Sequence, residues 1–162
     1  MEDVKIGDKV RCKVTKIEGV VCVRHDYLYG MANIGFRPEG SHQGKPHEMI
    51  HIDIAQAELV KSGVVSRDGL IPNKKVRLGD MCKDTISGFE GICTGIAEWL
   101  YSCSKVHVTP QKINEKTHKP VAGHWFDEPQ VEVKQEQVMT KTQNETGCPD
   151  KPVSSNHMGY SK

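Results

Sequence analysis

The sequence contains no long apolar segment. No stretch approaches the roughly 18 consecutive apolar residues that a membrane-spanning helix requires. The N-terminal residues MEDVKIGDKV also lack the basic and apolar regions of a signal peptide. We therefore expect a protein without membrane contacts that stays in the cytoplasm where it is made.

Net charge and aromatic residues are scarce as well. The formal net charge of the 162 residues is +1, and aromatic residues make up 6% of the chain. A chain without a charge excess has no strong electrostatic attraction to nucleic acids or to acidic membranes. Binding to a polyanion is therefore not the first expectation for this protein.

What the chain does contain is an internal repeat. The segment GFEGICTGI at 88–96 matches KIEGVVCVR at 16–24, and the two segments lie 72 residues apart. The match runs without a gap from 7–38 on 79–110, and two additional residues then raise the offset to 74. Self-similarity of this kind indicates two copies of one small structural unit.

The repeat predicts the domain organisation. A module of about 60 residues is near the lower size limit of an independent fold, so the copies are expected to pack together or to form oligomers. The Gln-, Thr- and Lys-rich segment after the second copy lacks apolar periodicity and is expected to be flexible unless a partner orders it. The expected division is a first module at residues 1–60, a linker at 61–75, a second module at 76–133 and a tail at 134–162.

Period-two alternation predicts strands in both copies. Ile34 and Phe36 alternate with polar or small residues, and glycine or proline recurs at short intervals. Several short strands in so few residues are typical of a small, strongly bent barrel. The predicted fold is mainly β: two tandem small β-barrels of the Tudor, KOW or Src-homology-3-like kind, forming separate antiparallel sheets, and a flexible C-terminal tail. Two pairs of equivalent core positions are expected: Val20 with Ile92, and Ile34 with Val106.

Three glycines mark a turn that the two copies share. Gly19 and Gly91 directly precede a predicted strand, and Gly88 lies before the Phe-Glu pair that leads to Gly91. Glycine adopts the positive φ that tight hairpin turns require, so all three are predicted to be structural turn residues. Lys16 occupies the position of Gly88 in the first copy, which predicts a different or looser turn there.

One segment has the spacing of a zinc peptidase motif. His47, Glu48 and His51 match HExxH, whose two histidines bind zinc only when they lie one turn apart on a helix. This segment follows Lys45-Pro46 in a predicted strand, where residues four apart are separated by about 13 Å. Chance histidines on a surface strand are the expected explanation.

The cysteines and remaining histidines give no stronger indication of a metal or catalytic site. The two copies do not share cysteine positions, which favours reduced thiols over a disulfide framework. Ordinary buried thiols and exposed imidazoles are expected rather than a zinc site with irregular spacing, for which the ligands would be Cys103, His107 and His124 with Cys82 or Cys93. We expect a protein that is not an enzyme and that holds no metal and no cofactor.

Aromatic residues recur at matched positions after the second predicted strand of each copy. They are Tyr27 and Tyr29 in the first copy, and Trp99 and Tyr101 in the second. Such rings either pack at the core or rim of a barrel or contact a ligand, and the sequence leaves both explanations open.

The adjacent residues Trp125 and Phe126 are a second aromatic feature. Neighbouring side chains on a strand point to opposite faces, so one ring is expected inside and the other outside, where it would make an interface anchor. The alternative is that both are buried, one in the barrel and one between the modules. The predicted partner-binding residues are Trp99, Tyr101, Trp125, Phe126, Tyr27 and Tyr29.

The second copy resembles a family of small tailed-bacteriophage proteins. The resemblance lies in LGDMCKDTISGFEGICTGIAEWLYSCSKVHVTP and HWFDEPQVEV, which together cover most of residues 78–133. The Gly-Asp and Glu-Gly pairs in the first of these strings also resemble the KOW pattern of ribosomal and transcription-elongation proteins. The phage resemblance implies a viral origin and a small fold, and no activity comes with it.

Two classes of function remain. The resemblance and the missing catalytic residues favour a non-enzymatic protein-interaction module of a bacteriophage, virion-associated or accessory, which binds a protein partner or copies of itself in the host cytoplasm or the virion. The alternative is a ligand-binding module for a nucleotide, as in proteins that sequester immune signals, or for nucleic acid. Nucleic-acid binding needs a basic face, whereas the lysines here are interspersed with acidic residues.

Overall fold

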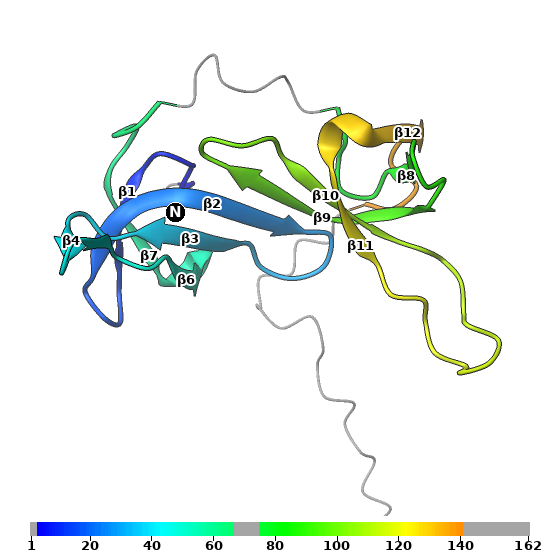
Figure 1. Ribbon diagram of the computed structural model, residues 1–162, viewed down its shortest axis with the longest axis horizontal. Coiled ribbons are helices and arrows are strands. Elements are labelled where there is room, and N and C mark those ends of the chain that lie inside the picture. Colours follow the sequence, from blue (N-terminus) through cyan, green and yellow to red (C-terminus); the bar gives the residue numbers. More distant parts are fainter. Residues whose placement is uncertain (1–2, 67–74, 141–162) are drawn as a thin grey trace, which may run out of the picture.

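The computed structural model describes residues 3–66 and 75–140 (Figure 1). Antiparallel strands dominate these residues, and the only helices described are two short 3-10 turns, so the mainly β prediction is confirmed. The first copy contains β1 (Lys9–Cys12), β2 (Glu18–Tyr27), β3 (Asn33–Arg37), β4 (Ser41–His42), β5 (Lys45–Pro46), β6 (Ile50–Asp53), η1 (Ile54–Gln56) and β7 (Ala57–Lys61). The second contains β8 (Met81–Asp84), β9 (Glu90–Trp99), β10 (Lys105–Thr109), β11 (His124–Asp127), η2 (Glu128–Gln130) and β12 (Val131–Gln135).

Both copies of the repeat have the same strand pairing. The ladder of the first copy runs in the order β7-β1-β2-β3-β6, and that of the second runs β12-β8-β9-β10-β11. A β-bulge at Cys22 on β2 recurs at Thr94 on β9, 72 residues later. The duplication in the sequence is therefore also a duplication of hydrogen-bond register.

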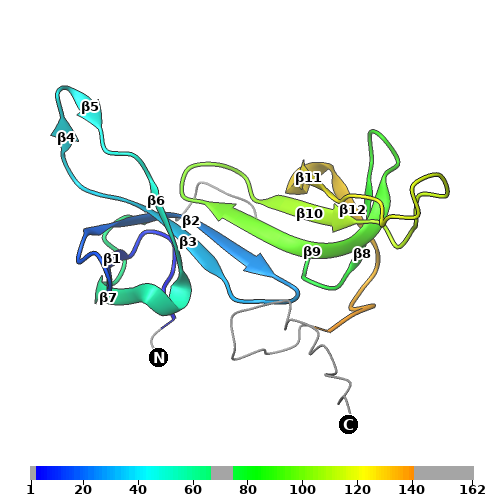
Figure 2. The ribbon, with the colours of Figure 1, turned by 90° about the horizontal axis from the view of Figure 1, so that it is seen from below.

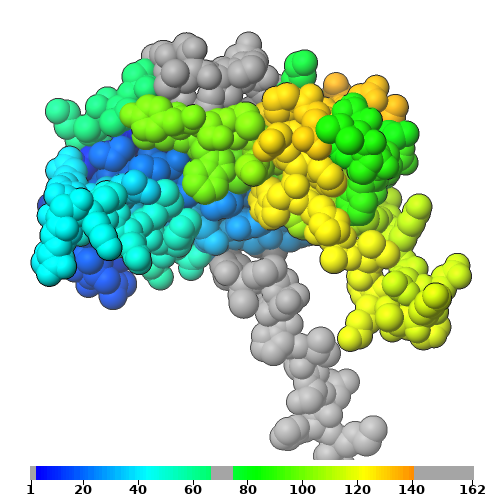
Figure 3. Space-filling model, in the orientation of Figure 1, coloured from blue at the N-terminus to red at the C-terminus, as the bar shows by residue number. Residues whose placement is uncertain are grey.

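The two ends of each ladder are not hydrogen-bonded to each other. Among the described strands, β6 does not pair with β7 and β11 does not pair with β12; each pair of strands is joined through a 3-10 turn. Closed barrels are therefore not formed. Two loops project from the strands: the β4–β5 hairpin (Figure 2) and the loop at residues 110–123 (yellow in Figure 3).

The prediction of two separate sheets is wrong, because β2 and β9 pair with each other and ten strands form one continuous sheet. Both strands are ten residues long, whereas β1 and β8 pair only with their first residues. The second half of each long strand thus has an uncovered backbone edge, and unpaired backbone groups away from water are costly. The two edges satisfy each other, and β2 and β9 lie side by side at the centre of the molecule (Figure 1).

An approximate two-fold axis relates the two copies. His25 pairs with Ala97, and these are equivalent positions of the repeat, so the axis passes through this pair. The two outermost hydrogen bonds of the ladder, each 2.9 Å long, are equivalent as well: Leu28 N–H to Thr94 O, and Leu100 N–H to Cys22 O.

Each copy has its own apolar core on one side of the sheet. Ile34 and Val106 are both 0% exposed and lie in the first and second core, as predicted. The other predicted pair is confirmed only in part: Ile92 is buried, at 2% exposed, whereas Val20 is half-buried, and the two apolar clusters contain the neighbouring residues Val21 and Cys93. Val21 and Cys93 pair across the strands with the buried Phe36 and Val108, which fixes their side chains on the core side.

The three predicted turn glycines have different physical roles. Gly88 has φ +75° and forms the predicted turn. Gly19 and Gly91 lie in strands without positive φ, so positive φ is not their reason. A side-chain carbon at Gly19 would lie 2.4 Å from Arg37 O, and one at Gly91 would lie 2.3 Å from Thr109 O. Close approach of a neighbouring backbone therefore requires glycine at these two positions.

Lys16 forms the same turn as Gly88, so the prediction of a looser turn in the first copy is wrong. Lys16 has φ +62°, and its N–H donates to Cys12 O at 2.9 Å, as Gly88 N–H donates to Asp84 O at 2.9 Å. A left-handed conformation costs an L-residue about 1–2 kcal/mol. The first copy thus contains a strained lysine where the second has an unstrained glycine.

We expect Lys16→Gly to raise the free energy of unfolding by about 0.5–1 kcal/mol, because relief of the left-handed strain exceeds the extra chain entropy of glycine. Urea denaturation of the full chain measures this difference. The reverse change, Gly88→Lys, is the matched control and should lower the free energy of unfolding. A Lys16→Gly variant no more stable than the parent would contradict the strain at Lys16.

A backbone clasp extends each copy beyond its predicted end. In the second copy the Asp80 carboxylate accepts N–H hydrogen bonds from Arg77 and Gln137, both at 2.8 Å, and Gly79 O accepts one from Met139 at 3.1 Å. The first copy repeats these contacts: Asp8 with Lys5 and Gly63, and Gly7 with Val65. Ordered structure therefore reaches residue 140, whereas 67–74 of the predicted linker and 141–162 of the predicted tail lie outside the described residues.

Candidate functional site

Pairing of β2 with β9 creates one face that belongs to both copies. On the side of the sheet away from the two cores, β6, β3, β2, β9, β10 and β11 present a continuous surface, which we call the junction face. Residues directly opposite on neighbouring strands share a side. They form three rows across the face: His51, Gly35, Val23 and Trp99; Asp53, Asn33, His25, Ala97, Lys105 and Asp127; and Tyr27, Gly95, His107 and Trp125.

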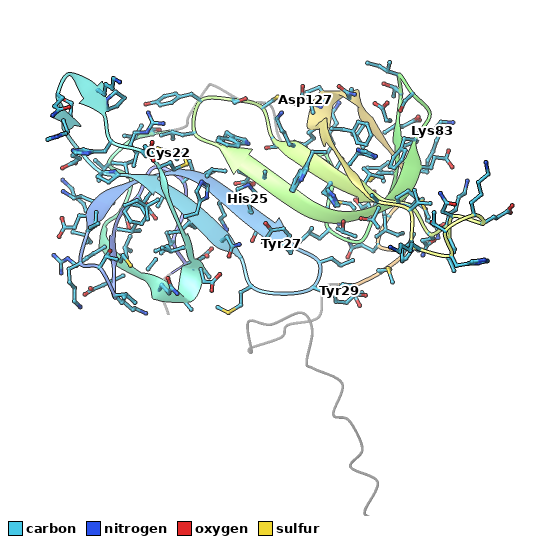
Figure 4. The ribbon with its side chains drawn as sticks, turned by 60° about the horizontal axis from the view of Figure 1, so that its bottom comes forward. Cys22, His25, Tyr27, Tyr29, Lys83 and Asp127 are labelled. Atoms are coloured by element: carbon cyan, nitrogen blue, oxygen red, sulfur yellow. The ribbon has the colours of Figure 1, made fainter. Side chains whose placement is uncertain are left out.

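His25 lies at the centre of the junction face. Its ring centroid lies between 6.2 and 6.4 Å from those of four other rings: Tyr27, His51, Trp99 and Trp125. Its equivalent across the axis, Ala97, has only a methyl group and leaves space for the imidazole. Figure 4 shows His25 and Tyr27 along β2, with Tyr29 in the turn that follows; Lys83 lies at the distant end of the second copy.

The junction face contains a pocket of about 380 Å³, lined by Tyr27, Tyr29, Thr94, His107 and Trp125. We call it the Trp125 pocket. Gly95 lies between its walls, because a side-chain carbon there would be 3.2 Å from Trp125 Cη2 and 3.5 Å from Tyr27 Cδ1. Tyr29 is 45% exposed and Trp125 43%, so two of its rings are accessible from solvent.

Two of the polar side chains that line the Trp125 pocket, Thr94 and His107, bind each other. Thr94 Oγ1 lies 2.8 Å from His107 Nδ1 and 2.7 Å from Thr109 Oγ1, within hydrogen-bonding distance of both. Burial lowers the pKa of His107 below its ordinary value, and the charge of His124 lowers it further. His107 is therefore neutral at pH 7, and no side chain that lines this pocket is charged.

The equivalent position in the first copy is filled. Val23 stands where the second copy has Gly95, and it is 0% exposed. A side-chain carbon on the facing Gly35 would lie 2.6 Å from Val23 Cγ1 and 2.7 Å from Met49 Sδ, so these two side chains cover Gly35. The two sides of the axis are therefore packed differently.

Two further hollows lie among the described residues. One, of about 350 Å³, shares Tyr27 with the Trp125 pocket and has a more polar lining. Its other lining residues are His25, Asn33, His51, Ile52, Asp53 and Gln56. The other, of about 490 Å³, lies near the N-terminus and contains Arg24. Arg24 already pairs with Asp3 at 2.8 Å and with Asp26 at 3.1 Å, so it offers no free charge to a ligand.

The structure places four of the six predicted contact residues at the junction face. Trp99 lies in its first row, Tyr27 and Trp125 in its third, and Tyr29 at the rim of the Trp125 pocket. Phe126 points the other way, packing against the second core with its ring 5.6 Å from that of Phe89. Tyr101 is 73% exposed in a turn and lines none of the hollows described here.

Three histidines of the junction face, His25, His51 and His107, are not among the predicted contact residues. The sequence draws attention to His51 only through the HExxH match and to His107 only as a possible zinc ligand, and His25 belongs to no motif. Period two does place His25 on the same side as Tyr27. The neighbourhood of Trp125 and His25, 6.2 Å apart, depends on the pairing between the copies, which the sequence did not predict.

The histidines and cysteines named as possible metal ligands do not form a group of three that could hold a metal ion in the described part of the chain. His51 lies on β6, which is a strand, and in the described ranges 3–66 and 75–140 no three His, Cys, Asp or Glu side chains are placed to hold a metal ion. Cys82 and Cys93 are both 0% exposed. Burial raises the pKa of Cys82 to about 12 and also raises that of Cys93, which makes both thiols poor nucleophiles.

In comparisons with known proteins, no family model matches this chain, and no curated protein and no solved structure matches it significantly. The resemblance to tailed-bacteriophage proteins therefore stays a prediction. Within the part of the chain that the structure describes, neither 3-10 turn has the length or apolar character to cross a membrane.

We expect the stability of the protein to fall as the pH is lowered from 7.5 to 5. Burial lowers the pKa of both His25 and His107, so the unfolded chain takes up their protons more readily than the folded one. The stabilisation is fully present above the ordinary pKa of about 6.5 and is lost as the pH falls through the lowered values. Melting temperatures at several pH values measure it. A double variant His25→Gln/His107→Gln with an equally steep loss would contradict the assignment to these imidazoles.

Proposed function

We propose that this protein is a non-enzymatic binding module that recognises a protein partner through the junction face. The observation that carries the proposal is the exposed indole of Trp125 beside Tyr29, on a surface to which both copies contribute. Large aromatic residues dominate the binding energy of protein interfaces, since they bury much area at a small entropic cost.

The charges of the junction face support a protein partner over a polyanion. Asp53 and Asp127 are exposed on it, and the Lys105 ammonium lies 3.6 Å from the Asp127 carboxylate. A phosphate group would meet two acidic side chains and a lysine that already has a partner. Nucleotide or nucleic-acid binding is thus the second candidate, for which the stacked rings of His25 and Tyr27 are the favourable feature.

Two finer points belong to the same proposal. The strand order of each copy, with a 3-10 turn before the last strand, is consistent with an opened small barrel of the Src-homology-3-like kind. The resemblance of the second copy to tailed-bacteriophage proteins makes a virion-associated or accessory phage protein the expected biological setting. Self-association of the chain through its uncovered strands is included as one form of protein binding.

The test is partner capture followed by affinity measurement with purified components. The full chain, Trp125→Ala and Tyr101→Ala are immobilised and exposed to lysate of cells that produce the protein. We expect Trp125→Ala to weaken binding of the purified partner about 30-fold, the effect of an interface hot spot of about 2 kcal/mol. Tyr101→Ala, an exposed aromatic away from the pockets, should leave the affinity unchanged.

Three results would contradict the proposal. The first is a partner that binds Trp125→Ala as tightly as the parent. The second is retention of nucleic acid or nucleotide instead of protein, with an affinity that falls steeply with salt. The third is the absence of any partner whose purified form binds the full chain.

A further inference from the structure

The two halves of the junction face have equivalent backbone pairing, but different side chains fill them. Tyr27 pairs with Gly95, and the equivalent pair across the axis is Trp99 with Val23. Val23 fills its side of the axis, whereas Gly95 leaves the space of about 380 Å³ that forms the Trp125 pocket. Within residues 3–66 and 75–140, the second copy therefore has a pocket at this place and the first copy does not, although the fold is duplicated.

The lining of the Trp125 pocket selects for a particular ligand chemistry. Tyr27, Tyr29 and Trp125 supply rings, and Thr94 Oγ1 and His107 Nδ1 already bind each other. A charged group placed there would lose its hydration without gaining a partner of opposite charge. A flat apolar ring gains offset or edge-to-face contacts with the wall rings instead.

We propose that the Trp125 pocket is a single anchor subsite that takes an aromatic side chain of the protein partner. This inference rests on the proposed function, and adds to it the chemistry of the anchor and a ratio of one anchor per chain. The source of the ring is a protein side chain and not a nucleobase, because the face around the pocket carries the exposed Asp53 and Asp127. No arginine or lysine lines the pocket to neutralise a phosphate.

The anchor is tested directly on the full chain by a nuclear magnetic resonance titration with N-acetyl-tryptophanamide. The chain has two tryptophans, so each indole N–H gives its own signal. We expect the Trp125 signal to shift with saturation at one equivalent site and a Kd of about 1–10 mM, the range of a single small group. The Trp99 signal, on the filled side of the axis, is the internal control and should move much less.

Two comparison ligands test the chemistry. N-acetyl-leucinamide presents the same amides with an aliphatic side chain and should bind at least about tenfold more weakly. Adenosine presents a planar ring from a nucleic acid and should also bind more weakly than the tryptophan amide. Equal binding of leucinamide would overturn the requirement for a ring, and tighter binding of adenosine would overturn the assignment to a protein side chain.

Gly95→Val tests the pocket by giving the second copy the residue that the first copy has. The first carbon of the new side chain would lie 3.2 Å from Trp125 Cη2, 3.3 Å from His107 Cβ and 3.5 Å from Tyr27 Cδ1, all side-chain atoms, so the valine occupies the space between these walls while the backbone pairing is kept. We expect at least about tenfold weaker binding of N-acetyl-tryptophanamide.

Should Gly95→Val fail to fold, Tyr29→Ala removes an exposed wall of the same pocket, with Tyr101→Ala as its matched control at the equivalent position of the repeat. An amide affinity unchanged in the folded Gly95→Val variant, or in Tyr29→Ala where Gly95→Val does not fold, would overturn the proposal.

The failure of this inference is distinguishable from the failure of the proposed function. A partner that requires Trp125 but binds Gly95→Val at full affinity, with no shift from the amide, leaves the protein-binding role intact and overturns the anchor. The absence of any partner overturns the role, and with it the source assigned to the ring. Two amide molecules bound per chain with equal affinity would overturn the single site.

Discussion

Replacing Gly79 by alanine is expected to lower the free energy of unfolding by about 2–4 kcal/mol, the range of severe single substitutions. Gly79 has φ +89°, a conformation unfavourable for alanine, and the new methyl carbon would lie 1.8 Å from Met139 O. The segment at Met139 must move away, which breaks the 3.1 Å hydrogen bond from its N–H to Gly79 O. Urea denaturation of the full chain gives the measurement.

Gly88→Ala is the control that separates conformation from contact. Gly88 also has positive φ, at +75°, but the nearest atom to an added methyl carbon is the flexible Lys83 Cε at 3.9 Å. Its cost should therefore be only the conformational cost of about 1–2 kcal/mol. Equal losses for Gly79→Ala and Gly88→Ala would show that the clasp around Met139 contributes nothing.

Asp80→Ala is expected to destabilise the protein by about 2–3 kcal/mol, since it removes the acceptor of several hydrogen bonds to a buried charged group. Asp80 is 0% exposed, and its carboxylate accepts the N–H groups of Arg77 and Gln137, both at 2.8 Å. Without the carboxylate these backbone donors lose their partner. The urea concentration at the unfolding midpoint should fall, while the slope of the unfolding free energy against urea concentration should stay the same. That slope reflects the surface exposed on unfolding, which this substitution changes little.

Asp8→Ala provides an independent second measurement of the same device. Asp8 is 5% exposed and accepts N–H groups of Lys5 at 2.8 Å and Gly63 at 2.7 Å. Because the geometry is the same, the loss should agree with that of Asp80→Ala within about 1 kcal/mol. A loss below about 0.5 kcal/mol at both positions, the range of an ordinary surface change, would refute the role of the carboxylates.

The most recognisable residues of the second copy serve its structure. Asp84 accepts hydrogen bonds from Ser87 N–H at 2.7 Å, from the Ser87 hydroxyl, and from Gln130 Nε2 at 2.8 Å. These bonds lower the pKa of Asp84 to about 2, with the Ser87 hydroxyl as the largest cause. Glu128 accepts backbone N–H groups of the segment that leads into the second copy, from Lys75 at 2.9 Å and Val76 at 3.2 Å. These motif residues stabilise the second copy, and none of them lines the Trp125 pocket.

The sequence was informative wherever one strand decided the outcome. Alternation predicted that one of Trp125 and Phe126 points inward and the other outward, without deciding which; in the structure Phe126 packs against the second core and Trp125 is exposed. Alternation alone gave the wrong residue in the first core: it predicted Val20, whereas the neighbouring Val21 lies there, next to the bulge at Cys22. A bulge shifts the alternation by one residue, and nothing in the residue types announces it.

The candidate site was only partly predictable for a related reason. The sequence predicts Tyr27, Trp99 and Trp125 as contact residues, but the surface that contains all three requires the ladder between β2 and β9. That ladder follows from two backbone edges that lack other partners. The residue types of a strand do not indicate whether its backbone edge has a partner. The proximity of His25 to Trp125 was therefore not predictable from the sequence.

The axis through His25 and Ala97 has a consequence for mass action. Two separate chains joined by this ladder would form a homodimer that dissociates on dilution, whereas covalent linkage makes the encounter intramolecular, at an effective concentration of about millimolar order. The fraction of chains in which the junction face is assembled therefore does not depend on the protein concentration. A homodimer must also carry the same residue on both sides of its axis. This chain carries valine at position 23 and glycine at position 95, so fusion gave it an asymmetric surface that no symmetric pair of chains can have.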